Sequence, residues 1–176
     1  MRLLLLLIPV GGIGQATSSS DALALLQKGD YLWQQAWPDS ALATYEKAYP
    51  LARTHAERVA VFHRVGKCYV RRFDFETARP WLDSALLLSD VVGALHPDVM
   101  FARAEKANII TFSGAFYEGL GKMRQIVADA GDLPPSADTL RAELIHRLSI
   151  YFHFVQDFDS AAYYGQKALD IRKQVY

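Results

Sequence analysis

Small and apolar residues recur along the chain at the spacing of paired helices. In four places a small residue is followed one helical turn later by a packing position, usually large and apolar, and then by a second small or apolar residue. The four sets are Ala41/Tyr45/Ala48, Ala78/Leu82/Ala85, Gly119/Met123/Ile126 and Ala161/Gly165/Ala168. Their first members lie 37, 41 and 42 residues apart, and a fixed period of this size is characteristic of repeat architectures. The pattern predicts an all-α stack of antiparallel helix hairpins.

The second hairpin shows the pattern most clearly. Val59, Phe62, Val65 and Tyr69 recur at helical spacing and predict one apolar stripe on its first helix. Gly66 interrupts the large residues of this stripe, although a glycine inside a helix costs about 1 kcal/mol relative to alanine. A glycine at that cost indicates that the backbone of a neighbouring helix comes too close for a side chain.

The return helix of the second hairpin contains a proline. Deep inside a helix, Pro80 would remove one hydrogen bond and clash with the preceding turn, whereas proline is tolerated in the first turn. We therefore expect this helix to begin near Thr77, after a turn at Asp74 and Phe75.

The first and fourth hairpins follow the same plan. The first begins at a cap formed by Ser20 or Asp21, turns near Trp37, and returns over about residues 40–49. The fourth repeats the apolar spacing of the second, with Ile145, Leu148, Ser149 and Phe152 on its first helix and Ala161, Tyr164 and Ala168 on its second.

The third hairpin has the weakest pattern. Its helices are expected over about residues 98–112 and 117–129, but Arg103 and Lys106 occupy positions where apolar residues are wanted. The segment 131–136 that follows is rich in glycine and proline and predicts a mobile loop.

These positions resemble the tetratricopeptide repeat (TPR). Its first helix carries a large, a small and an aromatic residue, and its second helix carries an alanine, an aromatic residue and another alanine. The residues that match this pattern, and that we expect to be structural, include Gly29, Ala41, Ala48, Gly66, Tyr69, Ala78, Ala85, Gly119, Ala161 and Ala168. The third repeat departs most, because Gly119 replaces the alanine and Met123 the aromatic residue. The resemblance implies a right-handed superhelical solenoid, with repeats at about 22–55, 59–95, 98–130 and 138–176.

The period resembles a subclass of longer repeats, of about 42 residues instead of the usual 34 or so. That subclass occurs in kinesin light chains and in bacterial proteins where the repeats precede caspase-like or histidine-kinase modules. A segment such as Ile171–Tyr176 usually leads into another repeat there. The resemblance therefore leaves two interpretations open: an independent interaction protein, or the N-terminal sensing region of a longer signalling protein or protease. A solenoid also needs a polar cap at its end. On the last hairpin, Tyr164, Ala168 and Ile171 are residues that normally pack against a neighbouring repeat, so they predict self-association through this hairpin.

The first residues have the layout of a secretory signal peptide. A basic start at Met1–Arg2 precedes an apolar run, and Gly14 and Ala16 place small residues before a cleavage site. Cleavage after Ala16 predicts a signal peptide over 1–16, a polar linker over 17–21 and export to the periplasm or the extracellular space. The apolar run is shorter than the 20 or so residues of a stable membrane span. A chance apolar N-terminus on a cytosolic protein is the alternative.

The composition narrows the classes of partner and chemistry. Lys and Arg number 19, as do Asp and Glu, so no overall charge favours a nucleic acid or an anionic membrane. Cys68 is the one cysteine and lies at a normally buried repeat position, which predicts a structural thiol. Residues 114–121 are rich in glycine but lack the Lys-Ser/Thr pair of a phosphate loop. The sequence therefore predicts no enzyme activity and no cofactor.

One helix carries the only arrangement with a hint of metal-ligand spacing. Glu143, His146 and His153 lie on the first helix of the fourth hairpin. Two helical turns separate the two histidines, which places them about 10 Å apart. One metal ion would need further ligands from elsewhere, so no metal site is predicted.

The resemblance implies that the first helix of each hairpin lines a concave groove that binds a protein or peptide. The candidate groove residues are His63, Lys67, Arg71, Asn108, His146 and His153. The first three are spaced four apart and form one polar row, within a segment (53–79) that holds seven basic and three acidic residues. One interpretation of this row is a site for an acidic peptide or a C-terminal carboxylate. The other is a solvated helix face that keeps the solenoid soluble.

Overall fold

The computed structural model describes residues 18–175, and the side chains from residue 21 onward. The predicted signal peptide over 1–16 lies outside the described residues. Within the described part, no helix is both long enough and apolar enough to cross a membrane.

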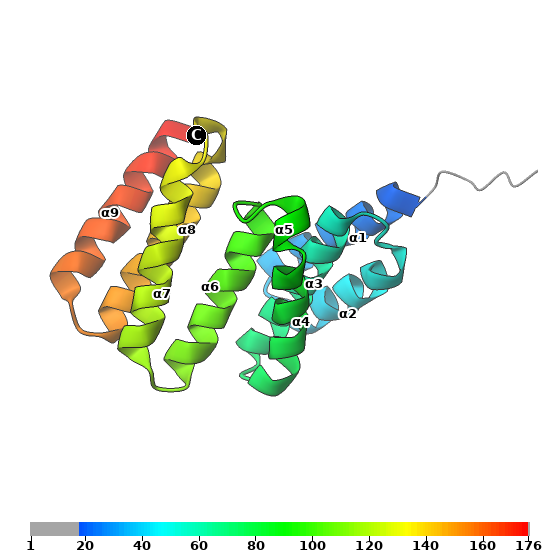
Figure 1. Cartoon of the computed structure of the whole chain (residues 1–176), viewed down its shortest axis with the longest axis horizontal. Coiled ribbons are helices and arrows are strands. Elements are labelled where there is room, and N and C mark those ends of the chain that lie inside the picture. The colour runs from blue at the N-terminus through cyan, green and yellow to red at the C-terminus, as the bar shows by residue number, and fades with distance from the viewer. Residues whose placement is uncertain (1–17, 176) are drawn as a thin grey trace, which may run out of the picture.

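The described residues fold into four antiparallel helix hairpins stacked side by side (Figure 1). The hairpins are α1 (Ser18–Gln34) with α2 (Pro38–Ala48), α3 (His55–Arg71) with α4 (Phe75–Leu87), α6 (Pro97–Phe112) with α7 (Phe116–Asp129), and α8 (Asp138–Phe154) with α9 (Phe158–Val175). Short helical turns complete the described chain, namely η1 (Tyr49–Leu51), α5 (Ser89–Val92), η2 (Ala130–Asp132) and η3 (Pro135–Ala137). The predicted all-α solenoid of hairpins is confirmed.

The four hairpin turns share one backbone geometry. Each contains one residue with a positive φ: Ala36 (60°), Phe73 (59°), Gly114 (96°) and Gln156 (61°). The N–H of the next residue then donates to a carbonyl five residues earlier, as in the bond from Asp157 to the Phe152 carbonyl at 3.0 Å. This is a Schellman end to each first helix. Repetition of the turn explains why the hairpins are alike despite their different turn sequences.

Small residues let the two helices of a hairpin approach closely. A side chain at Gly66 would place its Cβ 2.6 Å from Cδ2 of Leu82 on α4, which is closer than real contacts allow. The expectation of a close neighbour at Gly66 is therefore confirmed, but the closest atoms belong to the Leu82 side chain and not to a helix backbone. Among the predicted structural positions, the alanines Ala41, Ala48, Ala78, Ala85 and Ala168 are all buried.

The return helix of the second hairpin differs from its predicted start. It begins at Phe75, and the Asp74 carboxylate accepts a hydrogen bond from the Thr77 N–H at 3.2 Å. Pro80 consequently lies inside the helix, so the predicted start near Thr77 is wrong. The Schellman turn and the Asp74 cap fix the start of the helix, and the exposed position of Pro80 keeps its ring out of the core.

Ion pairs account for the weak apolar pattern of the third hairpin. Arg103 pairs with Asp129 on α7 at 2.5 Å, and Lys106 pairs with Asp83 on α4 at the same distance. These two side chains therefore connect α6 to its neighbours through ion pairs at positions where the pattern wanted apolar contacts. The following segment forms η2 and η3, and the Arg141 guanidinium donates to the carbonyls of Ala130 and Leu133.

Candidate functional site

The first helices of the four hairpins face a shared groove of about 1010 Å³. Helices α1, α3, α6 and α8 all contribute to its lining, together with the first two hairpin turns. The lining residues are Trp33, Ala36, Pro38, Lys67, Val70, Arg71, Phe73, Glu105, Asn108, Phe112, Glu143, His146, Arg147, Ile150, Tyr151 and Phe154. We refer to this cavity as the groove.

The carboxylates of the groove are neutralised within the protein. Arg147 on α8 lies 2.7 Å from Oε1 of Glu105 on α6 and 3.2 Å from Oε1 of Glu143. Arg172 on α9 lies 3.0 Å from the second oxygen of Glu143. Burial favours the neutral form of Glu105, but the charge of Arg147 prevails and holds the pKa of Glu105 below its usual value. Glu105 is therefore charged at neutral pH, and both acidic side chains of the groove are paired with arginines.

Amide and hydroxyl groups add hydrogen bonds to the ion pair that joins α6 and α8. Asn108 donates from Nδ2 to Glu105 at 2.8 Å and accepts from the Tyr151 hydroxyl at 2.6 Å. The amide of Asn108 is thus held by a partner on each side. Glu105, Asn108, Arg147 and Tyr151 therefore form a preorganised polar network between the third and fourth hairpins.

Two basic side chains of the groove have no carboxylate partner among the described residues. The Lys67 ammonium lies 4.1 Å from the centre of the Trp33 ring, a cation–π contact, and burial lowers the pKa of Lys67. Arg71 is exposed one helical turn further along α3. Both line the groove, and neither forms an ion pair within residues 18–175. The second hairpin therefore supplies the unneutralised positive charge of the groove.

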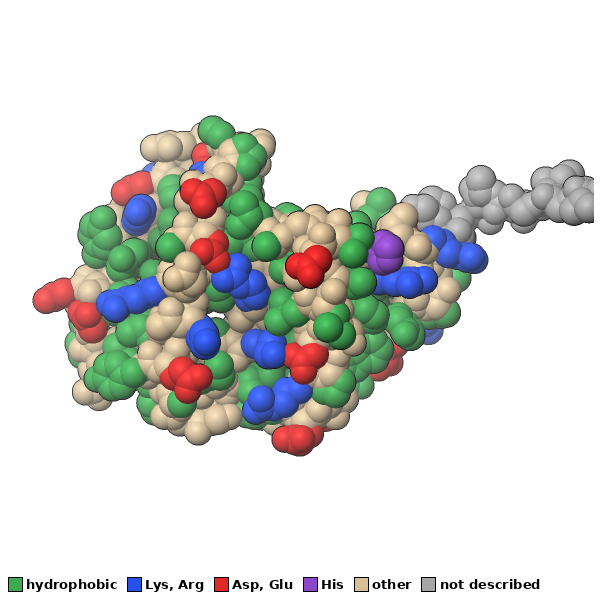
Figure 2. Space-filling view, viewed as in Figure 1, with side chains coloured by type: hydrophobic (Ala, Val, Ile, Leu, Met, Phe, Trp, Pro, Cys, Tyr) green, Lys and Arg blue, Asp and Glu red, His purple; other side chains and the backbone are tan. Residues whose placement is uncertain are grey.

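Figure 2 shows the charges on one face of the molecule. In this space-filling view both basic and acidic side chains lie among apolar patches. This distribution agrees with the balanced composition. The groove is therefore distinguished by its local pairing of charges and not by the charge of the whole molecule.

Four of the six predicted groove residues line the groove. Lys67, Arg71, Asn108 and His146 come together there from three helices. His153 does not line it: its ring is exposed and contacts Phe158, with 5.2 Å between the ring centres. His63 is only 5% exposed and also lies outside the lining.

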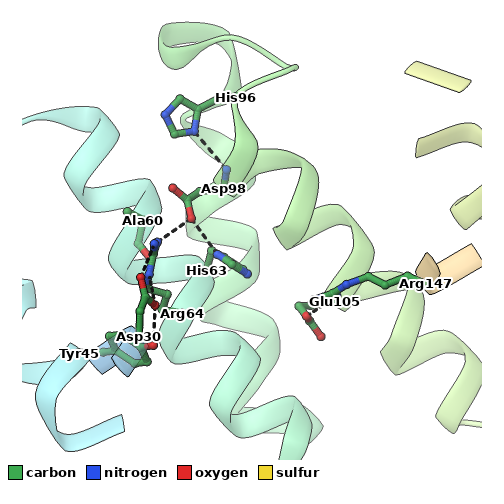
Figure 3. A network of polar contacts seen from close by, with 9 residues as sticks. All are labelled: Asp30, Tyr45, Ala60, His63, Arg64, His96, Asp98, Glu105 and Arg147. Carbon is green, nitrogen blue, oxygen red and sulfur yellow. Dashed lines mark hydrogen bonds and ion pairs between the residues drawn. The ribbon is translucent and has the colours of Figure 1, made fainter. Parts of the chain in front are cut away.

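The His63 side chain belongs to a buried polar junction between the first three hairpins (Figure 3). Its Nδ1 lies 2.9 Å from the Asp98 carboxylate, and the Arg64 guanidinium lies 2.7 Å from the same oxygen. Arg64 also donates to both oxygens of Asp30 at 2.9 and 3.0 Å, and Asp30 accepts from the Tyr45 hydroxyl. The junction therefore joins α1, α2, α3 and α6, which is a structural role.

Burial decides the protonation of this junction. It lowers the pKa of His63 despite the nearby Asp98, and the Nε2 atom has no hydrogen-bond partner among the described residues. Burial alone would raise the pKa of Asp98, but His63 and Arg64 outweigh it and lower that pKa to about 2. A neutral His63 that donates from Nδ1 pairs with a charged Asp98, and its Nε2 is left as a buried acceptor without a partner among the described residues.

The predicted groove residues do not include those that form most of the polar contacts between α6 and α8. Glu105 and Arg147 are 42 residues apart in the chain and were not singled out, and neither was Trp33 as the partner of Lys67. The sequence did contain one signal, which is that Arg64 and Arg147 occupy the same repeat position. Each lies two residues after the large apolar residue that opens the repeat pattern, Phe62 and Ile145 respectively.

Two further expectations concern chemistry. Within the described residues, no group of three or more His, Cys, Asp and Glu side chains could hold a metal ion. Cys68 is buried as a free thiol, and burial raises its pKa to about 12. A thiol in that state is a poor nucleophile at neutral pH.

Known structures resemble this chain in fold. No protein-family model matches the chain, and no curated protein matches it significantly. Two crystal structures of nearly identical TPR-like repeats, from a Podosopora anserina protein described as a kinesin light chain, do match. The first has a TM-score of 0.58 and 14% sequence identity, and the match covers 93% of this chain and 80% of that structure. The second has a TM-score of 0.55 and 14% sequence identity, and the match covers 92% of this chain and 79% of that structure. At this identity the likeness concerns the fold, and it confirms the predicted resemblance: the chain is an all-α solenoid of TPR-like repeats.

Proposed function

We propose that this protein is a non-catalytic scaffold that binds a partner protein or peptide in the groove. TPR-like repeats generally mediate protein–protein interaction. The observation that carries the proposal is the unequal pairing of charge in the groove. Glu105 and Glu143 are neutralised by arginines, whereas Lys67 and Arg71 have no carboxylate partner among the described residues.

This imbalance favours an acidic ligand. A carboxylate placed between Lys67 and Arg71 would gain charge-assisted hydrogen bonds in a partly desolvated site. It would also relieve the cost of holding Lys67 charged where burial lowers its pKa. Ile150 and the aromatic rings of Phe112 and Phe154 supply apolar contact beside these charges. The ligand is therefore an acidic peptide segment or a C-terminal carboxylate with a neighbouring apolar side chain.

The setting of the scaffold is a second part of the proposal. The layout of residues 1–16 supports export to the periplasm or the extracellular space. A second candidate function is that of a sensing region in a longer signalling protein or caspase-like protease. The exposed Tyr163, Leu169 and Val175 of α9 favour it, because they offer apolar surface to a further hairpin or to another copy of the chain. The reading frame after Tyr176 distinguishes these candidates.

The groove is tested by a charge reversal at its two unpaired cations. We would capture partners from the extracellular and envelope fraction of the source organism with residues 17–176 and identify them by mass spectrometry. Binding of each purified partner is then titrated against wild type and Lys67→Glu/Arg71→Glu. The expected result is a loss of affinity of at least about tenfold, because two attractive contacts become repulsive.

A matched control separates the groove from overall charge. The variant Lys28→Glu/Arg79→Glu makes the same change in net charge at two exposed residues that do not line the groove. It is expected to bind as wild type does. If both variants or neither lost the partner, the assignment of the groove to Lys67 and Arg71 would be wrong.

A further inference from the structure

Five phenylalanines from three successive hairpin turns form a chain of ring contacts. Phe73 contacts Phe75 and Phe112, with 6.0 and 5.4 Å between ring centres, and Phe75 stacks on Phe112 at 6.3 Å. Phe112 in turn contacts Phe154, and Phe154 contacts Phe116, both at 6.1 Å. We refer to Phe73, Phe75, Phe112, Phe116 and Phe154 as the phenylalanine row.

The phenylalanine row is exposed to solvent. Phe73 is 67% exposed, and Phe112, Phe116 and Phe154 are each 42% exposed. Single exposed apolar residues are ordinary on protein surfaces, whereas contiguous exposed patches mark sites of interaction. Four exposed rings in one chain of contacts therefore need a partner more than the isolated Leu87 does, although Leu87 is 81% exposed.

The repeated hairpin turn places these rings along one edge of the molecule. Phe112 and Phe154 are the last residues of α6 and α8, and Phe75 and Phe116 are the first residues of α4 and α7. The three turns lie along the lower edge of Figure 1. Phe73, Phe112 and Phe154 also border the groove, but Phe75 and Phe116 do not line it. The row thus continues outward from the groove onto a second surface.

Exposed carboxylates accompany the phenylalanine row. The same three turns and the starts of their return helices carry Asp74, Glu76, Glu118, Asp157 and Asp159, all of them exposed. None of these five forms an ion pair within the described residues.

Three basic residues belong to the second turn and the helix ends beside it, namely Arg71, Arg72 and Arg79. Arg72 pairs with Asp39 on α2, and Arg71 lines the groove. The edge is therefore apolar along its rings and negative around them. An anionic membrane surface is a poor match for it, because like charges repel.

We propose that the phenylalanine row and its surrounding carboxylates bind a cationic amphipathic segment of a partner protein. The apolar face of the segment lies on the rings, and its lysines or arginines face the carboxylates and the ring faces. This surface is distinct in charge from the groove, whose unpaired side chains are basic. Phe73, Phe112 and Phe154 contribute to both surfaces. Phe116 and the carboxylates lie outside the groove lining, so the inference does not depend on the ligand proposed for the groove.

The carboxylates also have a structural use, which does not account for the rings. Asp74 and Asp157 accept hydrogen bonds from the N–H groups of Thr77 and Ser160, and acidic residues in a first turn stabilise a helix. Helix capping requires no exposed phenylalanine. The combination of both features along three turns is what indicates a binding surface.

The test uses two designed peptides that differ only in charge. One is a helix-forming peptide of about 18 residues with leucines on one face and lysines on the other, and the second has glutamate in place of lysine. Binding to the full chain is measured by fluorescence anisotropy at low and moderate salt. The expected result is that the lysine peptide binds, more weakly as salt rises, and that the glutamate peptide does not bind at this edge.

Three variants locate the binding. Phe116→Ser is expected to weaken it by about tenfold, since this ring lies in the row but outside the groove lining. Glu76→Gln/Glu118→Gln/Asp159→Asn is expected to weaken it by about fivefold and to flatten its salt dependence. Leu87→Ser removes an exposed apolar side chain that is not in the row and is expected to leave binding unchanged.

Several outcomes would overturn the proposal. They are equal binding of both peptides, an equal effect of Phe116→Ser and Leu87→Ser, and binding of the chain to anionic vesicles but not to the lysine peptide. Self-association of the wild-type chain that Phe116→Ser abolishes would assign the row to a second copy instead. The groove variant Lys67→Glu/Arg71→Glu is expected to keep lysine-peptide binding, so failure of one proposal is distinguishable from failure of the other.

Discussion

Two arginines at the same repeat position connect successive hairpins in different ways. Arg64 on α3 reaches back to Asp30 on α1, and Arg147 on α8 reaches back to Glu105 on α6. Both junctions are drawn in Figure 3. Their guanidinium groups are similarly shielded, with side chains 21% and 19% exposed.

The two junctions differ in what surrounds them. Arg64 also contacts Asp98, and with His63 stacked on Phe101 the junction lies outside the groove lining. Arg147, by contrast, forms part of the groove surface together with Glu105. One repeat position therefore serves helix packing at one junction and shapes a binding surface at the other. The neighbouring helices decide the role, and the position alone does not.

Loss of Arg64 is expected to have the largest effect on stability. In Arg64→Ala, the Asp98 carboxylate, whose side chain is 15% exposed, loses its guanidinium partner. Removing one member of a buried ion pair costs about 3–5 kcal/mol, and the partial exposure of Asp30 and Asp98 places the expected loss at the lower end, about 3 kcal/mol. Urea unfolding with an unchanged m-value measures it. Arg79→Ala at an exposed position is the control, and a similar loss there would contradict the assignment.

The Arg147 junction is tested by removing both charges together. Arg147→Met alone leaves Glu105 buried without its main partner and is expected to cost about 2–3 kcal/mol. Adding Glu105→Gln removes the second charge and is expected to restore most of the lost free energy of unfolding. A double-mutant cycle by urea unfolding measures the coupling. Simple additivity of the two single effects would show that the pair is not coupled.

Acid is expected to destabilise the two junctions over different ranges of pH. Burial lowers the pKa of His63 in the folded state, so the unfolded chain binds more protons there as pH falls below about 6.5. The contribution of His63 to the free energy of unfolding is therefore fully present above about pH 6.5, and it decreases as the pH falls below that value. The pKa of Glu105 is also lowered, but that contribution is lost only as pH falls below about 4.3. Asp98, with a pKa of about 2, adds a further loss between about pH 4 and pH 2.

The measurement is a series of unfolding curves from pH 7.5 to pH 3 for wild type and for His63→Gln. Glutamine does not titrate and its amide can donate to Asp98 in place of Nδ1. The variant is expected to lose the decrease between pH 6.5 and pH 5 while keeping the steeper loss at lower pH. An unchanged pH profile would mean that His63 is not the titrating group.

Local pattern was sufficient to predict the fold. The spacing of Ala78, Leu82 and Ala85 and the helix-breaking cost of Gly66 identified the paired helices and their close approach. Pro80 misled the prediction of a helix start, because the tight turn at Phe73 and the cap at Asp74 fix that start regardless of the proline.

The candidate site was less predictable from sequence because it depends on contacts between hairpins. His63 has the same spacing as Lys67 and Arg71, yet Asp98 and Phe101 of α6 cover it. Nothing in the local sequence of α3 indicates that cover. The pairing of Glu105 with Arg147 spans 42 residues, and only the packing of α6 beside α8 brings the two together.

The smallest predicted effect concerns the fourth hairpin turn, which follows α8. Gln156 has a φ of 61°, a region where a residue with a Cβ is strained by roughly 1–2 kcal/mol. Gln156→Gly is expected to relieve that strain, partly offset by the greater entropy of the unfolded chain, for a net gain of about 0.5–1 kcal/mol. Urea unfolding measures it, with Gln166→Gly inside α9 as a control that should lose about 1 kcal/mol. Because Gln156 contacts neither arginine junction, its gain should add to the loss in Arg147→Met, and non-additivity would show that the turn and the junction are coupled.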